Sequence, residues 1–426
     1  MKIQSVRGTR DFYPDAMALR TWLFDAWRRA SRRAGFVEVD GPVLEPLDLY
    51  IEKSGEEIVE QLYWLEDKSG RRLALRPEFT PTLARMIAAK QAALPAPIRW
   101  FNVSRCFRYE RAQKGRLREF FQWNVDLLGA EGEIADAECI ALAVDGLREV
   151  GLAADDVVVR INDRRLLAAL MEHLGVAEAQ VPDVFAALDK RDKVPPEALA
   201  EMLADAGLNE AQKGGLDRIL AWQTLGDIDA EERATPDVAE AVSQLDRLFA
   251  HLEAYGIADW CRFDIGIVRG LAYYTGPVWE VHDRKGDFRA VFGGGRYDRL
   301  LEAMGGKPMP ACGFGCGDAV LGLLLEARGL VPEPPHVAEY YVAAAGGADE
   351  AAVVSVVRCL RGAGRAAMFD PTGGSLKRQM KKASDAGARY VVIVGDTFAA
   401  EGRVTLRDMQ SGDQRDVPLE ELDAGR

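Results

Sequence analysis

The stretch FNVSRCFRYERAQKGRLREFFQWNVDLLG, residues Phe101–Gly129, carries the pattern on which the interpretation of the whole chain depends. It predicts a strand with Arg105, Phe107 and Arg108, then a basic loop, then a returning strand over Glu119–Leu128. Side chains alternate across a strand, so Arg108 and Glu110 are expected to share one face. One face of the returning strand is expected to carry Phe120, Gln122, Asn124 and Asp126. An arginine, a carboxylate and an aromatic ring beneath a basic loop suit a nucleoside triphosphate, although an ordinary surface hairpin would also explain the charges.

The composition is that of a globular protein with more than one core. The chain has 426 residues, 48% hydrophobic and 28% charged, and this length suggests two or three domains. It has no apolar run of membrane-spanning length, and we expect no secretory signal because the N-terminal stretch lacks an apolar core. The six cysteines are scattered without a CxxC pair, which predicts reduced thiols in a cytoplasmic protein and no structural metal site. The net charge of −13 argues against general affinity for polyanions, so any nucleic-acid binding would depend on local basic patches.

The ordered string FRYERxQKGRxREFxQxNxD resembles motif 2 of class II aminoacyl-tRNA synthetases, and most closely that of histidyl-tRNA synthetases. A second segment, Asp264–Glu280, has strand character and contains RGLAYYTG, which is similar to the RGLDYYTG signature of the same family. Arg269 would supply a fixed guanidinium that braces an oxyanion, with Tyr273 and Tyr274 as flat walls. Ala272 stands where the family pattern has aspartate, so whatever that carboxylate supports must be managed otherwise.

Two blocks near the N-terminus follow the order of this family. A helix from Pro14 and a strand over Phe36–Pro46, broken at Gly41-Pro42, resemble motif 1, which implies a homodimer. Glu78 and Thr80 stand at a strand-to-helix junction. They either cap the helix or, as the resemblance implies, bind the α-ammonium group of an amino acid.

Two glycine-rich blocks come later. Arg289–Gly306 contains a triple glycine, which lets the backbone approach another group closely, and its RYD run resembles the block in which Tyr297 reaches the histidine pocket. Pro310–Gly329 is expected to form a strand, a glycine turn and a buried helix, as motif 3 does. Motif 3 usually carries an arginine that clamps the γ-phosphate, but this chain has Val320 there. Either Arg269 and the motif 2 loop suffice, another cation substitutes, or the ATP chemistry has been lost.

The resemblance implies an α+β class II catalytic domain over residues 1–330, an antiparallel sheet flanked by helices. Residues 164–255, rich in Ala, Leu and Glu, are expected to interrupt it as a helical insertion. A stiff linker over 331–337 leads to residues 338–426, where alternating β and α elements predict a small three-layer α/β domain. The run SLKRQMKKASDAGARYVVIVGD resembles the anticodon-binding domain shared by histidyl, threonyl, prolyl and glycyl synthetases. Two basic groups either form solvated surface or contact tRNA: Lys114 and Arg118 in the motif 2 loop, and Lys377, Arg378 and Lys381 here.

The activity that the resemblance implies is the joining of histidine to its tRNA, tRNA(His), with ATP and nucleotide-bound Mg²⁺. Arg108 and Arg269 would be catalytic, on opposite sides of the histidine carboxylate and the α-phosphate. In ATP binding, Glu110 would accept from the adenine amino group, Phe120 would stack on the ring, and Arg116 would hold the outer phosphates beside Arg108. Histidine would be bound by Glu78, Thr80, Arg108, Gln122, Asp126, Arg269, Tyr273, Tyr274 and Tyr297. Within that set, Asp126 with Tyr274 and Tyr297 would read the imidazole.

Two other functions remain open at this point. A non-catalytic histidine-sensing relative, similar to the regulatory subunit of ATP phosphoribosyltransferase, would explain Val320. It would not explain the intact motif 2 loop, RGLAYYTG and the last domain. A synthetase for threonine, proline or glycine would share the last domain but has no reason to keep RGLAYYTG.

Overall fold

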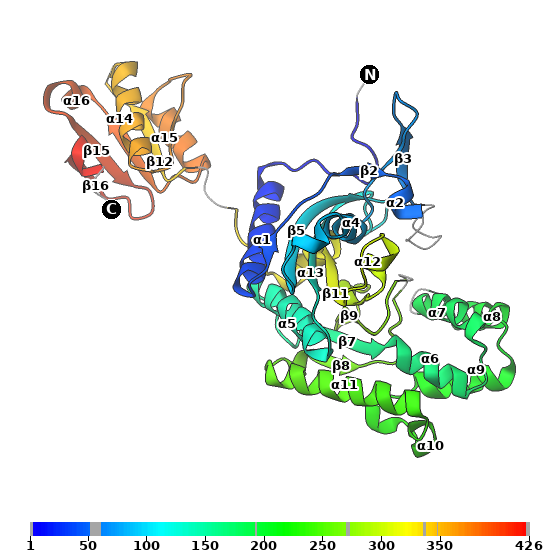
Figure 1. Cartoon of the computed structure of the whole chain (residues 1–426). Coiled ribbons are helices and arrows are strands. Elements are labelled where there is room, and N and C mark those ends of the chain that lie inside the picture. Colours follow the sequence, from blue (N-terminus) through cyan, green and yellow to red (C-terminus); the bar gives the residue numbers. More distant parts are fainter. Residues whose placement is uncertain are drawn as a thin grey trace. The chain divides into compact units, whose positions relative to one another are not determined.

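The computed structural model describes residues 3–51, 61–191, 194–269, 273–334, 338–346 and 348–422 (Figure 1). Ala272, singled out above, lies outside these residues. The chain divides into two compact units, Met1–Pro332 and Glu333–Arg426, and each has its own hydrophobic core. Among the helices of the described residues, none is long and apolar enough to cross a membrane.

The first unit is built on a sheet to which the described residues contribute eight strands. In spatial order these are β1 (Val37–Glu38), β5 (Ile98–Phe107), β6 (Glu119–Leu128), β11 (Ala311–Gly317), β10 (Phe292–Arg296), β9 (Pro277–Asp283), β7 (Val157–Asp163) and β8 (Cys261–Phe263). Neighbouring strands are antiparallel except at the two edges, where β1 and β8 run parallel to their partners. The expected antiparallel sheet flanked by helices is confirmed.

The two faces of this sheet differ in character, as β6 illustrates. Trp123, Val125 and Leu127 are buried in the main core together with residues of α1 (Pro14–Arg33), α5 (Glu133–Glu149) and α13 (Asp318–Arg328). The residues between them point to the other face, because side chains alternate along a strand. Asn124 and Asp126 on that face stand opposite glycines of β11. The sheet therefore has one apolar face that holds the helices and one polar face.

Shorter elements complete the first unit. A second sheet contains β2 (Leu44–Pro46), β4 (Arg72–Leu75) and β3 (Tyr63–Glu66), and α2 (Asp48–Ile51) follows β2 in the chain. Two further helices, α4 (Thr80–Lys90) and α12 (Leu300–Ala303), pack against each other. Within residues 164–255 the helices are α6 (Arg164–His173), α7 (Val181–Asp189), α8 (Pro196–Asp205), α9 (Glu210–Leu220), α10 (Ala230–Arg233) and α11 (Pro236–Ala254). Figure 1 shows α11 running along α5, which connects this helical segment to the core.

Four strand expectations were wrong in part. β5 ends at Phe107, so Arg108 and Glu110 lie in the loop rather than on a strand face. The expected strand over Phe36–Pro46 is two short strands, β1 and β2, in different sheets. The glycines of β11 belong to the strand itself, and α13 follows without a glycine turn.

The fourth expectation concerns Asp264–Glu280. Among the described residues of this range, 264–269 and 273–280, only those from Pro277 onward form a strand. Asn162 on β7 provides the physical reason. Its buried Nδ2 donates to the carbonyl oxygens of Ile265 and Ile267 at 2.8 and 3.0 Å. One side-chain amide thus satisfies two backbone acceptors that a strand would have paired with its neighbour.

The second unit is the expected three-layer α/β domain. Its sheet has the order β13 (Ala367–Phe369), β12 (Tyr340–Ala344), β14 (Tyr390–Val394), β15 (Arg403–Asp408) and β16 (Gln414–Pro418). Tyr340 and Val342 of β12 join one core with α14 (Glu350–Gly362), whereas Tyr341 and Ala343 join another with α15 (Leu376–Asp385). Since neighbouring strand residues face opposite ways, the two helices cover opposite faces. A short helix that the sequence analysis missed, α16 (Asp396–Glu401), precedes β15.

Candidate active site

Four glycines form a bare patch on the polar face of the large sheet. Gly293 and Gly295 alternate along β10 and stand opposite two glycines of β11. A Cβ atom on Gly293 would lie 3.1 Å from Nη1 of Arg269, and one on Gly295 would lie 2.9 Å from a ring carbon of Tyr274. The missing side chains therefore let Arg269 and Tyr274 lie against the backbone of the strand.

The two glycines of β11 have the same effect on the other half of the patch. A Cβ atom on Gly313 would lie 2.8 Å from Oη of Tyr297 and 3.0 Å from Oδ1 of Asp126. One on Gly315 would lie 2.6 Å from Nε2 of Gln122. Five side chains that the sequence predicts to bind ligand thus lie against these four glycines, Gly293, Gly295, Gly313 and Gly315, which we call the glycine floor. Two of the four belong to the triple glycine.

Asp126 lies in a buried group of tyrosines. Tyr297 donates a hydrogen bond to Oδ1 of Asp126. The rings of Tyr273, Tyr274 and Tyr297 are in mutual contact, with centroids 5.1, 5.8 and 6.4 Å apart. Tyr273 in turn donates to Oε2 of Glu78 at 3.3 Å. The structure therefore connects Asp126, through two tyrosines, to the carboxylate expected to bind an ammonium group.

The electrostatics of Asp126 follow from its surroundings. Burial raises the pKa of its carboxyl group to about 7, the Tyr297 hydrogen bond opposes this rise, and the charge of Glu78 adds to it. A carboxyl group with such a pKa releases its proton readily once a positively polarised partner enters the pocket. An imidazole N–H is a partner of that kind.

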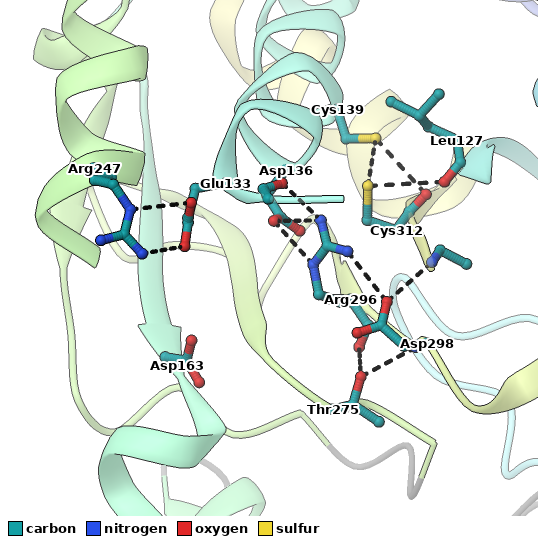
Figure 2. Close-up of polar contacts among 12 residues, drawn as sticks. Leu127, Glu133, Asp136, Cys139, Asp163, Arg247, Thr275, Arg296, Asp298 and Cys312 are labelled. Carbon is teal, nitrogen blue, oxygen red and sulfur yellow. Dashed lines mark hydrogen bonds and ion pairs between the residues drawn. The ribbon is translucent and has the colours of Figure 1, made fainter. Parts of the chain in front are cut away.

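Arg296 and Asp298, the residues on either side of Tyr297, are held by the polar contacts that Figure 2 shows. The buried guanidinium of Arg296 donates from Nε and Nη2 to Oδ2 of Asp136 on α5, at 3.0 and 2.7 Å. Its Nη1 donates to Asp298 at 3.1 Å, and Asp298 also accepts from the backbone N–H of Ala311. The RYD run thus holds Tyr297, which is expected to bind histidine, between two anchoring residues, Arg296 and Asp298. The sequence analysis did not identify these two as anchors.

Arg269 is held in an unusual backbone conformation by a carboxylate. Its φ of 57° lies in the left-handed region, which is uncommon for residues other than glycine. Nη1 of Arg269 donates to Oε1 of Glu280 on β9. Burial alone would raise the pKa of Glu280, but the charge of Arg269 lowers it to about 2. Strain at one residue, balanced by a neighbouring charge, is common at functional sites.

The loop between β5 and β6 carries the residues expected to bind the nucleotide. A tight turn closes it, because the N–H groups of Gln113 and Arg116 each donate to the other residue's carbonyl oxygen. Gly115 occupies this turn with a φ of 75°, which favours glycine. Nη1 of Arg116 lies 3.2 Å from Oε2 of Glu110, so these two side chains form an ion pair.

The base of the loop adjoins the amino-acid pocket. The guanidinium of Arg108 lies 5.4 Å from the ring centroid of Phe120, and its Nε donates to the carbonyl oxygen of Pro77 at 3.0 Å. Pro77 precedes Glu78, so the two expected ligand-binding regions meet at Arg108. Thr80 is the first residue of α4 and lies two residues beyond Glu78.

An N-terminal segment supports the loop, and the sequence analysis gave it no role. The carbonyl oxygen of Gly8 accepts hydrogen bonds from the N–H groups of Arg118 and Glu119. Arg10 donates from Nη2 to Asp318 at 2.6 Å, and Asp318 also accepts from the N–H of Phe121. The first residue of α13 is thereby joined to both β6 and the N-terminal segment.

The residues expected to contact tRNA fall into two groups. Lys114 lies over the ring of Phe288, whereas Arg118 donates to the carbonyl oxygen of Glu110 and lies over Tyr109. Lys377, Arg378 and Lys381 are exposed on α15 of the second unit. A role in tRNA binding stays a prediction for all five.

Comparisons with known proteins point to a single family. A family model described as histidyl-tRNA synthetase matches residues 8–317, and one described as an anticodon binding domain matches residues 339–424. A histidine–tRNA ligase of Opitutus terrae is 42% identical over 426 residues, which cover 99% of this chain and 97% of that protein. The chloroplastic/mitochondrial histidine–tRNA ligase of Arabidopsis thaliana is 41% identical, and the match covers 98% of this chain and 85% of that protein.

Solved structures give the same result over the full length. The histidyl-tRNA synthetase of Nostoc sp. PCC 7120 matches with a TM-score of 0.82 and 25% identity, covering 99% of both chains. A protein of Bacillus halodurans, described as an ATP phosphoribosyltransferase regulatory subunit/histidyl-tRNA synthetase, matches with a TM-score of 0.75 and covers 92% of this chain. With the family model covering most of the chain and relatives above 40% identity, the chain belongs to the histidyl-tRNA synthetase family.

Proposed function

We propose that this chain activates histidine with ATP to give histidyl-adenylate and then transfers the histidyl group to tRNA(His). The observation that carries the proposal is the buried pair of Asp126 and Tyr297, set on the glycine floor next to a loop rich in arginine. A buried carboxylate that loses its charge partner is costly, so ligands without an N–H at that point bind poorly. The pocket thus favours an imidazole over other small side chains.

The histidine side chain would lie between Asp126 and the three tyrosines, with its N–H toward Asp126. Glu78, which accepts from Tyr273, would receive the α-ammonium group together with Thr80 and Gln122. The carboxylate would then point toward Arg108, because Arg108 is bonded to the carbonyl oxygen next to Glu78. These roles are assigned from the contacts between the side chains and from the family resemblance.

The nucleotide would occupy the side of the floor nearest the loop. Phe120 would stack on the adenine ring, Glu110 would accept from its amino group, and Arg116 would bind the outer phosphates. Because Glu110 and Arg116 form an ion pair with each other, ATP would have to compete with that pair for both side chains. Mg²⁺ would enter with the nucleotide, held mainly by phosphate oxygens, as is usual for this ion.

Little covalent assistance is required from the protein. The histidine carboxylate attacks the α-phosphate, and pyrophosphate leaves on the opposite side. Arg108 and Arg269 would flank the reacting groups and neutralise the charge that develops there. Fixed positioning and charge stabilisation of this kind supply most of the rate in such reactions.

Assembly and tRNA contacts form a further part of the proposal. The exposed basic residues of α15 would contact tRNA, in keeping with the anticodon-binding model that matches the second unit. A homodimer would cover exposed apolar side chains near β1 and β3, among them Val37 and Trp64, which are 61% and 59% exposed. Sedimentation analysis tests the dimer. The cytoplasmic location stays a prediction.

Histidine-dependent exchange of pyrophosphate into ATP tests the activity directly. The purified protein should catalyse exchange with histidine and not with threonine, proline or glycine. Charging of tRNA(His) should follow under the same conditions. Histidine binding without exchange would instead favour a non-catalytic, histidine-sensing relative. Such a function would explain why Val320 stands in place of the motif 3 arginine.

A further inference from the structure

We infer that Arg289, from the connection between β9 and β10, binds the outer phosphates of ATP and serves in place of the arginine that Val320 has replaced. This inference rests on the proposed function and adds a phosphate-binding residue to it. The sequence analysis quoted Arg289 only as the start of a glycine-rich block and gave it no role.

The side chain of Arg289 reaches across to the nucleotide loop. Its Nη2 donates to the carbonyl oxygen of Gly115 at 2.7 Å, although the two residues are 174 positions apart in the chain. Gly115 is part of the turn that also contains Arg116, which is assigned to the outer phosphates. Arg289 is therefore fixed at the end of the loop where those phosphates would lie.

Arg289 and Val320 both lie next to Gly115 in the nucleotide loop. A Cβ atom built on Gly115 would lie 3.1 Å from Cγ2 of Val320 and 3.9 Å from Nε of Arg289. Val320, on the first turn of α13, is almost fully buried, and its short side chain ends at the loop. The end of the Val320 side chain and Nε of Arg289 thus both lie next to Gly115. The chain thus presents a guanidinium at this position from a different segment.

The charges around Arg289 favour a polyanion. The Arg289 side chain is exposed overall, and its partial removal from water lowers its pKa. The charges of Arg116 and Arg108 lower this pKa further, while the charge of Glu110 raises it. Three guanidinium groups therefore influence one another around a single carboxylate, Glu110. Among the described residues, Arg289 forms no ion pair, so its charge is left for a ligand to neutralise.

Guanidinium groups suit this task because their planar fork of N–H donors matches phosphate oxygens. Arg289 uses one donor on the loop carbonyl, which orients the fork and leaves other N–H groups available. A side chain already oriented loses less entropy when it binds. The same hydrogen bond would keep the loop closed over the nucleotide.

Calorimetric titration with ATP and with AMP, each with Mg²⁺, tests the inference without any amino acid present. AMP lacks the outer phosphates, so it reports on the adenine and α-phosphate contacts alone. For Arg289→Ala we expect ATP affinity to fall about tenfold or more, the usual effect of a lost charge-assisted hydrogen bond. AMP affinity should change less than about twofold. Arg289→Lys keeps the positive charge but loses the planar fork of N–H donors. Its ATP affinity should lie between those of the wild type and Arg289→Ala.

Lys285→Ala is the matched control. Lys285 is an exposed cation of the same connection, so its removal changes net charge equally without reaching the loop. In the double variant R289A/V320R we expect ATP affinity to recover in part, since position 320 reaches the same glycine. Unchanged ATP affinity in Arg289→Ala would overturn the inference, and so would an equal loss for ATP and AMP, because Arg289 would then only shape the loop. The proposed function has a separate test, since it fails if the wild-type protein shows no histidine-dependent exchange.

Discussion

Gly313 and Asp126 face each other across β11 and β6, and a methyl group on the glycine would lie 3.0 Å from the Asp126 carboxylate. The position of the acid thus depends on a side chain that is missing from the neighbouring strand. The same relationship holds at Gly315 for Gln122. Glycines within the strands are therefore part of the binding site, even though they offer no functional group.

Substitution of Gly315 by alanine should weaken histidine binding without unfolding the protein. The new methyl group would meet the end of the Gln122 side chain at 2.6 Å, a flexible group that can move aside. We expect the KM for histidine in pyrophosphate exchange to rise about tenfold, with the KM for ATP much less affected. Gly317→Ala is the control, since no heavy atom of the described residues lies within 4 Å of a Cβ there. If both substitutions changed the KM for histidine equally, the proposed role of Gly315 in making room for Gln122 would be contradicted.

Asp126→Ala should lower histidine affinity far more than ATP affinity. The variant leaves the imidazole N–H and the Tyr297 hydroxyl without their buried acceptor, which typically costs about 1–3 kcal/mol for each group. Binding of each substrate alone can be followed by calorimetry. A similar loss for both substrates would place Asp126 away from the imidazole.

The raised pKa of Asp126 also predicts how stability depends on pH. Its pKa of about 7 in the folded protein lies above the value of about 3.9 for an unfolded aspartate, so the folded state holds the proton more tightly. The contribution of this group to stability is fully present below about pH 4 and is lost as the pH rises to about 7. The side chain at position 126 in the variant Asp126→Asn does not titrate, so the Tm of this variant should rise relative to that of the wild type between about pH 4 and about pH 7, and the difference should stay level above about pH 7. Tryptophan fluorescence follows the first unit alone, because all eight tryptophans lie there.

Glu280→Gln should slow adenylate formation rather than weaken substrate binding. Removal of the charge that fixes Arg269 lets the guanidinium move away from the reacting phosphate. We expect kcat for exchange to fall about tenfold, and more than either KM changes. His282→Ala removes the other partner of Glu280 but leaves Arg269 in contact with it, and should have little effect. A change confined to KM would show that Arg269 acts mainly in binding.

Asp318→Ala should destabilise the first unit by about 1–3 kcal/mol, because it leaves the buried N–H of Phe121 without an acceptor. Urea unfolding followed by tryptophan fluorescence measures this loss. A double-mutant cycle measures the coupling free energy between Arg10 and Asp318. It compares the free energies of unfolding of Arg10→Ala, Asp318→Ala and the double variant with that of the wild type. Zero coupling would mean that the N-terminal segment is held by its backbone bonds to the loop alone.

Local patterns were enough to predict some of the elements on which the site stands. The alternation of Gln122, Asn124 and Asp126 with apolar residues predicted the polar face of β6, because strand periodicity is a local property. The family motifs then predicted which of the polar side chains bind ligand.

The residues missed by the sequence analysis have partners far away in the chain. Arg10 and Asp318 are 308 positions apart, and Arg296 and Asp136 are 160 apart. Sequence shows that such residues are charged but does not show which charge each one meets. The error over Asp264–Glu280 has the same origin, because a distant side chain, Asn162, takes the place of a strand neighbour.

The glycine floor also limits how this enzyme can evolve. Glycine codons begin with GG, and each single-nucleotide change that yields another amino acid adds a side chain. At Gly293, Gly295, Gly313 and Gly315, mutation can therefore only fill space and never create it. New substrate preferences would have to arise in the surrounding side chains, such as Asp126 and Tyr297. Random mutagenesis aimed at altered specificity should accordingly recover changes around the floor and leave the four glycines in place.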